Sequence, residues 1–63
     1  MENEKRTLIA DRICFAEKGK EARIIVNGAL YLTTPVVATW RSLFTGRITI
    51  ETMNTYYVYN PTA

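Results

Sequence analysis

The dipeptide Asn27-Gly28 constrains the fold of this chain more than any other feature, because it favours a tight reversal of direction. Both residues tolerate the positive backbone angles of a type I′ turn, the turn that best joins two antiparallel strands. Apolar and β-branched residues flank it, over 22–26 before and 29–33 after. We therefore predict a β-hairpin. Its expected cross-strand pairs are Ile25 with Leu30 and Ile24 with Tyr31.

Both faces of this hairpin are apolar, since its side chains alternate between faces without alternating in polarity. A strand pair of this kind lies inside a sandwich, a barrel or an oligomer. The hairpin therefore needs cover on both sides.

A second hairpin is predicted over 47–59, where two β-branched and aromatic arms flank Met53-Asn54. A two-residue loop at Met53-Asn54 sets the register of the arms. The expected pairs are Thr52 with Thr55, Glu51 with Tyr56, Ile50 with Tyr57, Thr49 with Val58 and Ile48 with Tyr59. One face then carries Ile48, Ile50, Tyr57 and Tyr59, and we expect it to face the core. The other carries Arg47, Thr49, Glu51, Tyr56 and Val58, and we expect it to face solvent.

The remaining segments are less sharply defined. Residues 7–16 predict a further strand, and the charged run 17–21 predicts a turn. Residues 35–44 fit a short helix, with Thr34 as its N-cap and Gly46 as its stop. Their β-branched content favours a strand instead. We prefer the strand and keep the helix as the alternative.

These elements predict an all-β fold of SH3-like size. We expect five to six antiparallel strands that form a small barrel or a strongly bent meander, over residues 7–63, after a flexible polar segment over 1–6. An antiparallel sheet of this kind exposes its edges unless it closes or pairs with another molecule.

The size and charge of the chain indicate self-association. A 63-residue domain has a small core, and its single cysteine and lack of histidine exclude a disulfide framework and argue against a zinc site. From Ala22 to the C-terminus, 42 residues carry four charges: Arg23, Arg41, Arg47 and Glu51. A surface with so few charges is expected to be covered in part. We therefore predict a homo-oligomer.

Enzymatic function is disfavoured by the absence of histidine, which leaves Cys14 and Ser42 without the usual general base. We expect Cys14 to be a buried, inert thiol in its apolar surroundings. No glycine-rich phosphate motif is present. The expectation is a protein that is not an enzyme, with no cofactor and no metal.

Four residues are the candidate binding residues: Trp40, Arg41, Arg47 and Tyr56. Trp40 and Tyr56 would act as aromatic anchors, and the arginines would bind carboxylates or phosphates. The same residue types form protein interfaces and platforms for single-stranded nucleic acid.

We therefore expect a small binding protein that occludes another protein or sequesters a small polar, nucleotide-like ligand. A single-strand nucleic-acid-binding barrel is the alternative, less favoured because three arginines make a weak basic patch. The short length is also typical of inhibitors encoded by phages or mobile elements, although no residue role follows from that. The absence of a long apolar run and of a signal peptide predicts a cytoplasmic protein without membrane contact.

Overall fold

The computed structural model describes residues 5–61, which form seven β-strands and no helix. The strands are β1 (Arg6–Ala10), β2 (Arg12–Phe15), β3 (Glu21–Val26), β4 (Ala29–Pro35), β5 (Ala38–Arg41), β6 (Ile48–Glu51) and β7 (Thr55–Tyr59). The all-β class is confirmed. The preferred strand interpretation of residues 35–44 is confirmed for Ala38–Arg41, which form β5, whereas residues 42–44 lie in the loop that follows.

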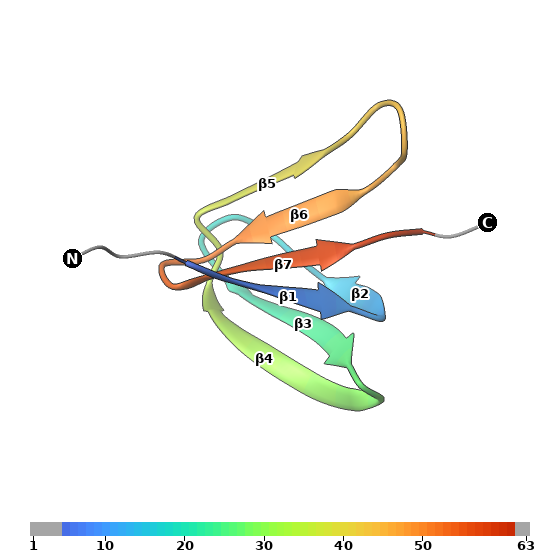
Figure 1. The fold of residues 1–63 in the computed structure, drawn as a ribbon. Coiled ribbons are helices and arrows are strands. Elements are labelled where there is room, and N and C mark those ends of the chain that lie inside the picture. The colour runs from blue at the N-terminus through green and yellow to red at the C-terminus, as the bar shows by residue number, and fades with distance from the viewer. Residues whose placement is uncertain (1–4, 62–63) are drawn as a thin grey trace.

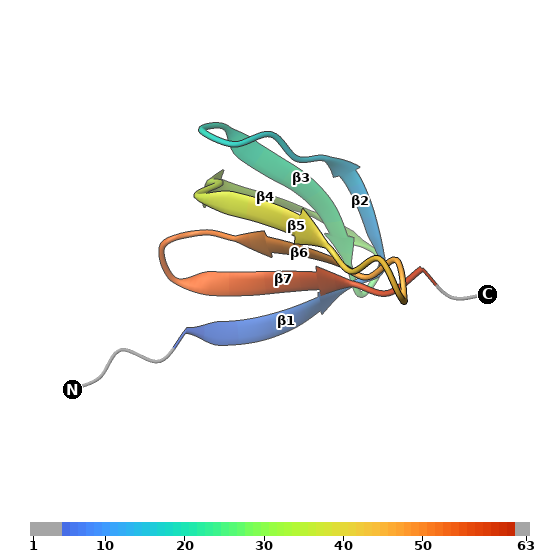
Figure 2. The same cartoon turned by 90° about the horizontal axis from the view of Figure 1, so that it is seen from above.

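The strands form two sheets, ordered β1-β7-β6-β5 and β2-β3-β4 (Figure 1). Over residues 5–61 the two sheets are strongly inclined to one another and do not close into a barrel (Figure 2). The expected antiparallel pairing holds with one exception, since β1 pairs with β7 in parallel. The fold is therefore an open pair of sheets. Of the two expected forms, a small barrel or a strongly bent meander, the closed barrel is not formed, and the strands number seven instead of five or six.

The prediction of one strand over 7–16 is wrong, because the chain bends at Asp11 and passes from one sheet to the other. The Asp11 N–H donates to the carbonyl of Ile25 at 2.7 Å, and its carboxylate accepts from the Gly28 N–H at 3.2 Å. These bonds fix the corner against the β3–β4 turn. β1 and β2 therefore contribute to different sheets although one residue separates them.

Both predicted hairpins have the expected registers. Asn27 and Gly28 have φ angles of 53° and 81°, the left-handed conformation that a type I′ turn requires. In the second hairpin Met53-Asn54 forms the loop, and the Thr52 N–H donates to the Thr55 carbonyl at 2.9 Å. Local turn chemistry therefore determines four of the seven strands.

We expect Gly28→Ala to lower the free energy of unfolding by about 1–2 kcal/mol, because a side chain at positive φ strains the backbone. A Cβ at this position would have no heavy atom within 4 Å, so the loss reports backbone strain without a clash. Urea denaturation followed by circular dichroism measures it. Asn27→Gly relieves strain one residue away and is the control. Equal stability of Gly28→Ala and the wild-type chain would contradict the turn assignment.

The core between the sheets is small. Its buried members are Ala10, Ala22, Ile24, Val36, Ile50 and Tyr57, with Leu8, Ile13, Ala16, Val26, Ile48 and Tyr59 packed around them. The predicted core face of the second hairpin is confirmed. The first hairpin is covered on one face only, since Ile24 is in the core whereas Leu30 and Leu32 are 60% and 58% exposed.

Cys14 is exposed, so the prediction of a buried thiol is wrong. The register of β2 against β3 shifts between Ile13 and Phe15. The neighbouring residue Ile13 packs against the core, so alternation along β2 places Cys14 on the opposite face. The described part of the chain also contains no helix that is long and apolar enough to cross a membrane.

Candidate binding surface

The face of the β1-β7-β6-β5 sheet that points away from the core gathers most of the candidate residues. We call it the outer face. Strand pairing places its residues in two rows, Ala38–Glu51–Tyr56–Thr7 and Trp40–Thr49–Val58–Ile9. Trp40 and Tyr56, separated by 15 intervening residues in the sequence, thus lie on one surface. Hairpin register and the position of β5 beside β6 bring them together.

Trp40 and Tyr56 make an edge-to-face contact, with ring centroids 6.4 Å apart and planes at 71°. Trp40 is 50% exposed, whereas Tyr56 is partly buried. The Lys5 ammonium lies 5.2 Å from the centroid of the Tyr56 ring, in a cation–π arrangement. One face of Tyr56 is therefore occupied, and Trp40 is the more accessible aromatic ring of the pair.

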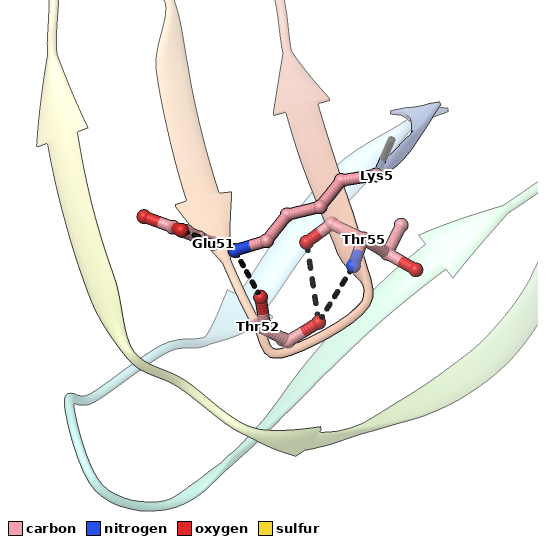
Figure 3. Close-up of polar contacts among 4 residues, drawn as sticks. All are labelled: Lys5, Glu51, Thr52 and Thr55. Atoms are coloured by element: carbon pink, nitrogen blue, oxygen red, sulfur yellow. Dashed lines mark hydrogen bonds and ion pairs between the residues drawn. The ribbon is translucent and has the colours of Figure 1, made fainter. Parts of the chain in front are cut away.

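Lys5 is fixed in this position by two partners at the end of the β6–β7 hairpin (Figure 3). Its ammonium pairs with the Glu51 carboxylate and donates to the Thr52 carbonyl at 3.0 Å. The buried Thr52 hydroxyl in turn donates to the Thr55 carbonyl at 3.1 Å and accepts from the Thr55 N–H at 3.3 Å. Of the segment predicted to be flexible, Lys5 thus contacts the sheet and Arg6 begins β1, while residues 1–4 lie outside the described residues.

The outer face is less solvated than the hairpin alone predicts. Val58 is on this face, outside the core cluster, and yet is 5% exposed. Its neighbours in the row are Thr49 and Ile9, and Ile9 comes from β1. The expectation that Val58 faces solvent is wrong because the parallel strand β1 extends the sheet beside it.

The two candidate arginines lie on different sides of the sheet. Arg41 shares a row with Ile48 and Tyr59, whose side chains pack toward the core, although Arg41 itself is exposed on the edge strand β5. Arg47 precedes Ile48 and by alternation lies on the Trp40 side. The structure therefore brings Trp40, Tyr56 and Arg47 to one face and leaves Arg41 on the other.

The loop between β5 and β6 carries two exposed apolar residues that the sequence analysis did not select. Leu43 and Phe44 are 96% and 99% exposed. We call this pair the apolar tip. Figure 1 shows the loop projecting beyond the sheets. The signal available in the sequence is a leucine and a phenylalanine beside Thr45-Gly46, in a turn from which side chains cannot reach a core.

Hydrogen bonds define the conformation of this loop. The Ser42 hydroxyl accepts from the N–H groups of Phe44 and Thr45 at 3.2 and 3.3 Å, and the Ser42 carbonyl accepts from the Gly46 N–H at 2.9 Å. The Arg47 N–H donates to the Thr45 hydroxyl at 3.1 Å. The backbone beneath the apolar tip is therefore well bonded, and the tip is exposed without being unstructured.

Comparison with protein-family models, curated proteins and solved structures finds no significant match to this chain. Among residues 5–61, no group of three histidine, cysteine, aspartate or glutamate side chains gathers in a way that would hold a metal ion. The outer face and the apolar tip offer apolar contact through Trp40, Leu43 and Phe44, beside the Lys5–Glu51 ion pair and the threonine residues of the outer-face rows.

Proposed function

We propose that this protein is a non-enzymatic binding protein that occludes a surface of another protein. Its contact surface consists of the apolar tip together with the part of the outer face around Trp40. The observation that carries the proposal is the near-complete exposure of Leu43 and Phe44 on a hydrogen-bonded loop. Large apolar side chains in that setting gain free energy only when another surface covers them.

The ordered loop favours tight binding, because a contact group held in place before association loses less conformational entropy on binding. The tip projects, so its partner must supply a concave apolar site. Arg47 lies on the Trp40 side of the same hairpin, and a carboxylate at the rim of that concave site would complement it. An occluded pocket on the partner is the functional consequence, as expected of an inhibitor.

The proposal includes self-association. Ten large apolar side chains among the described residues are exposed, and the core holds few large ones. A homo-oligomer would cover some of them and supply stability that the small core lacks.

Site-specific photo-crosslinking in the source cell tests the contact surface. A photoreactive phenylalanine analogue at position 44 should give one dominant crosslinked protein, and the same analogue at Met53 should not. Met53 is the matched control, since it is an exposed apolar residue on the loop at the opposite end of β6. We expect Phe44→Ala to weaken binding of the purified crosslinked protein by at least tenfold, with Met53→Ala unchanged.

Equal crosslinking from positions 44 and 53 would mean that exposed apolar residues react without specificity, and the proposed surface would be rejected. Equal affinity of Phe44→Ala and the wild-type chain would reject it as well.

Binding of single-stranded nucleic acid is the second candidate, favoured by the accessible Trp40 ring on the same face as Arg47. Lys5 on the Tyr56 ring counts against it, because a stacked base would have to displace that ammonium. Trp40 is the single tryptophan, so its fluorescence reports binding directly. Quenching by oligonucleotides that weakens steeply with salt would favour this candidate. Quenching by mononucleotides alone would favour sequestration of a small ligand.

A further inference from the structure

The edge strand β4 differs from the other three edge strands of the two sheets in having no charge. Strands β1, β2 and β5 contain Arg6, Arg12 and Arg41, respectively, whereas the sequence has no charged residue between Arg23 and Arg41. Six of the seven residues of β4 are exposed. Figure 1 shows this strand at the outer edge of its sheet, with β3 on its other side. Natural edge strands usually carry a charge or an early proline that prevents pairing with another chain.

The direction of the backbone groups shows what the free edge offers. The Ile25 carbonyl accepts from Asp11, on the side of β2, so the peptide groups of the alternate residue Ile24 point toward β4. Ile24 pairs with Tyr31, so Tyr31 uses its N–H and C=O on β3. The N–H and C=O groups of Leu30 and Leu32 consequently face the free edge, with the apolar side chains of the same residues exposed beside them.

We infer that β4 pairs in antiparallel fashion with β4 of a second copy of this chain, across a two-fold axis at Tyr31. In that register Tyr31 faces the partner's Tyr31, Leu30 faces the partner's Leu32, and Ala29 faces the partner's Thr33. The two Leu30–Leu32 pairs exchange four backbone hydrogen bonds, and the three-stranded sheet becomes a continuous six-stranded sheet. β4 pairs with β3 in regular register over Ala29–Leu32, and the bulge begins beyond Leu32. The three central residues of the proposed contact, Leu30, Tyr31 and Leu32, therefore lie in the regular stretch.

A second copy fits this edge better than an unrelated protein does. Residues 29–33 read Ala-Leu-Tyr-Leu-Thr, so a reversed copy places leucine opposite leucine and the smaller residues Ala29 and Thr33 opposite each other. Neither copy brings a charge to the contact. A dimer would also stabilise the fold, which has a small core, before the chain binds any other protein. A second copy is present wherever the chain is made. The inference rests on the self-association in the proposed function and identifies β4 as the strand through which the two copies pair.

Disulfide trapping tests the register. Cys14 is exposed, so the experiment uses a Cys14→Ser background. Across the proposed axis the two residues 31 form a non-hydrogen-bonded pair, with Cα atoms about 4.5 Å apart, within the range of a disulfide. Tyr31→Cys should therefore oxidise to a covalent dimer in dilute solution. Met53→Cys, on the loop between β6 and β7 and more exposed than Tyr31 (71% against 43%), should remain largely monomeric on a denaturing gel.

Charge pairing tests the contact without a crosslink. Leu30→Lys/Leu32→Lys places lysine opposite lysine, and Leu30→Glu/Leu32→Glu places glutamate opposite glutamate. Each variant alone should sediment as a monomer, whereas the wild-type chain should sediment at twice the 7.2 kDa of one chain. An equimolar mixture of the two variants should form a dimer again, because each lysine then faces a glutamate. Recovery on mixing also shows that both variants are folded.

A wild-type chain that is monomeric at every concentration, or a dimer that persists in both charged variants, would overturn the inference. Failure of the mixture to reassociate when both variants have native circular dichroism would overturn it too. None of these results affects the proposed contact surface, which is on the other sheet and is tested at Phe44. A dimer that is lost in Phe44→Ala and retained in the charged variants would instead place self-association at the apolar tip.

Discussion

Ile50→Ala should leave a large fraction of the chain unfolded under conditions in which the wild-type chain is native. Truncating a buried isoleucine to alanine costs about 2–5 kcal/mol, through lost apolar contact and the cavity left behind. A chain of 63 residues has a total stability of about 3–9 kcal/mol at typical values per residue. The substitution therefore removes a large share of the stability that the domain has.

The substitution at Ile50 has a large effect because of the place of this residue in the sheet. It lies in β6, between β5 and β7, directly between Thr39 and Tyr57. Its side chain is 0% exposed, and only Ile24 and Thr52 are comparably large and fully buried among the described residues. With so few large buried groups, no neighbouring cluster compensates for the loss of one.

Urea denaturation of Ile50→Ala, Ile50→Val and Met53→Ala separates this effect from general sensitivity. Ile50→Val should cost about 0.5–1.5 kcal/mol, because one methylene is lost. Met53→Ala should stay within about 0.5 kcal/mol of the wild-type chain, because Met53 is exposed. Equal destabilisation by Ile50→Ala and Met53→Ala would show that the core is not centred on β6.

The two hairpins could be predicted from the sequence because a short turn determines its own register. Asn27-Gly28 favours one type of tight turn, which sets the register of β3 against β4. With Met53-Asn54 as the loop, the flanking residues pair so that the isoleucines and tyrosines share one face. These features depend on neighbours in the chain. The alternation of side chains then follows without reference to the rest of the molecule.

The remaining topology depends on contacts between distant segments, and the sequence analysis did not find it. The parallel pairing of β1 with β7 joins residues about 50 positions apart. The bend at Asp11 depends on the position of the β3–β4 turn, to which that residue is bonded. The burial of Val58 follows from the same parallel pairing, since the hairpin alone leaves that face open.

Only part of the candidate surface could be predicted, because some of its contacts come from segments that are distant in the sequence. Hairpin geometry places Tyr56 on the outer face. The strand predicted over 35–44 is observed as β5, whose pairing with β6 brings Trp40 beside Tyr56. The cover that Lys5 gives to Tyr56 comes from the N-terminal segment, which its polar composition suggested was free. Leu43 and Phe44 were missed because the prediction of one strand or helix over 35–44 included them, whereas β5 ends at Arg41 and both residues lie on the loop after it.

Trp40→Ala should weaken binding of the occluded protein by about 30-fold or more. A tryptophan anchor at an interface commonly contributes 2 kcal/mol or more, and 1.4 kcal/mol corresponds to a factor of ten in affinity. The half-exposed ring on the outer face leaves room for further contact, and its edge-to-face partner Tyr56 holds its orientation. Binding would cover the exposed half of the ring and exclude water from it.

Phe15→Ala is the matched control, because Phe15 is an aromatic residue of similar exposure, 41%, on the other sheet. Titration calorimetry with the partner identified by crosslinking gives both affinities, and denaturation gives both stabilities. Loss of the Trp40–Tyr56 contact should also lower stability by about 0.5–1.5 kcal/mol, so affinity is compared at a temperature where every variant is fully folded. Equal weakening by Trp40→Ala and Phe15→Ala would show that exposed aromatic area of any kind drives association. Weakening by Trp40→Ala alone would localise recognition to the sheet that also carries the apolar tip, because Phe15 is an exposed aromatic residue on the other sheet.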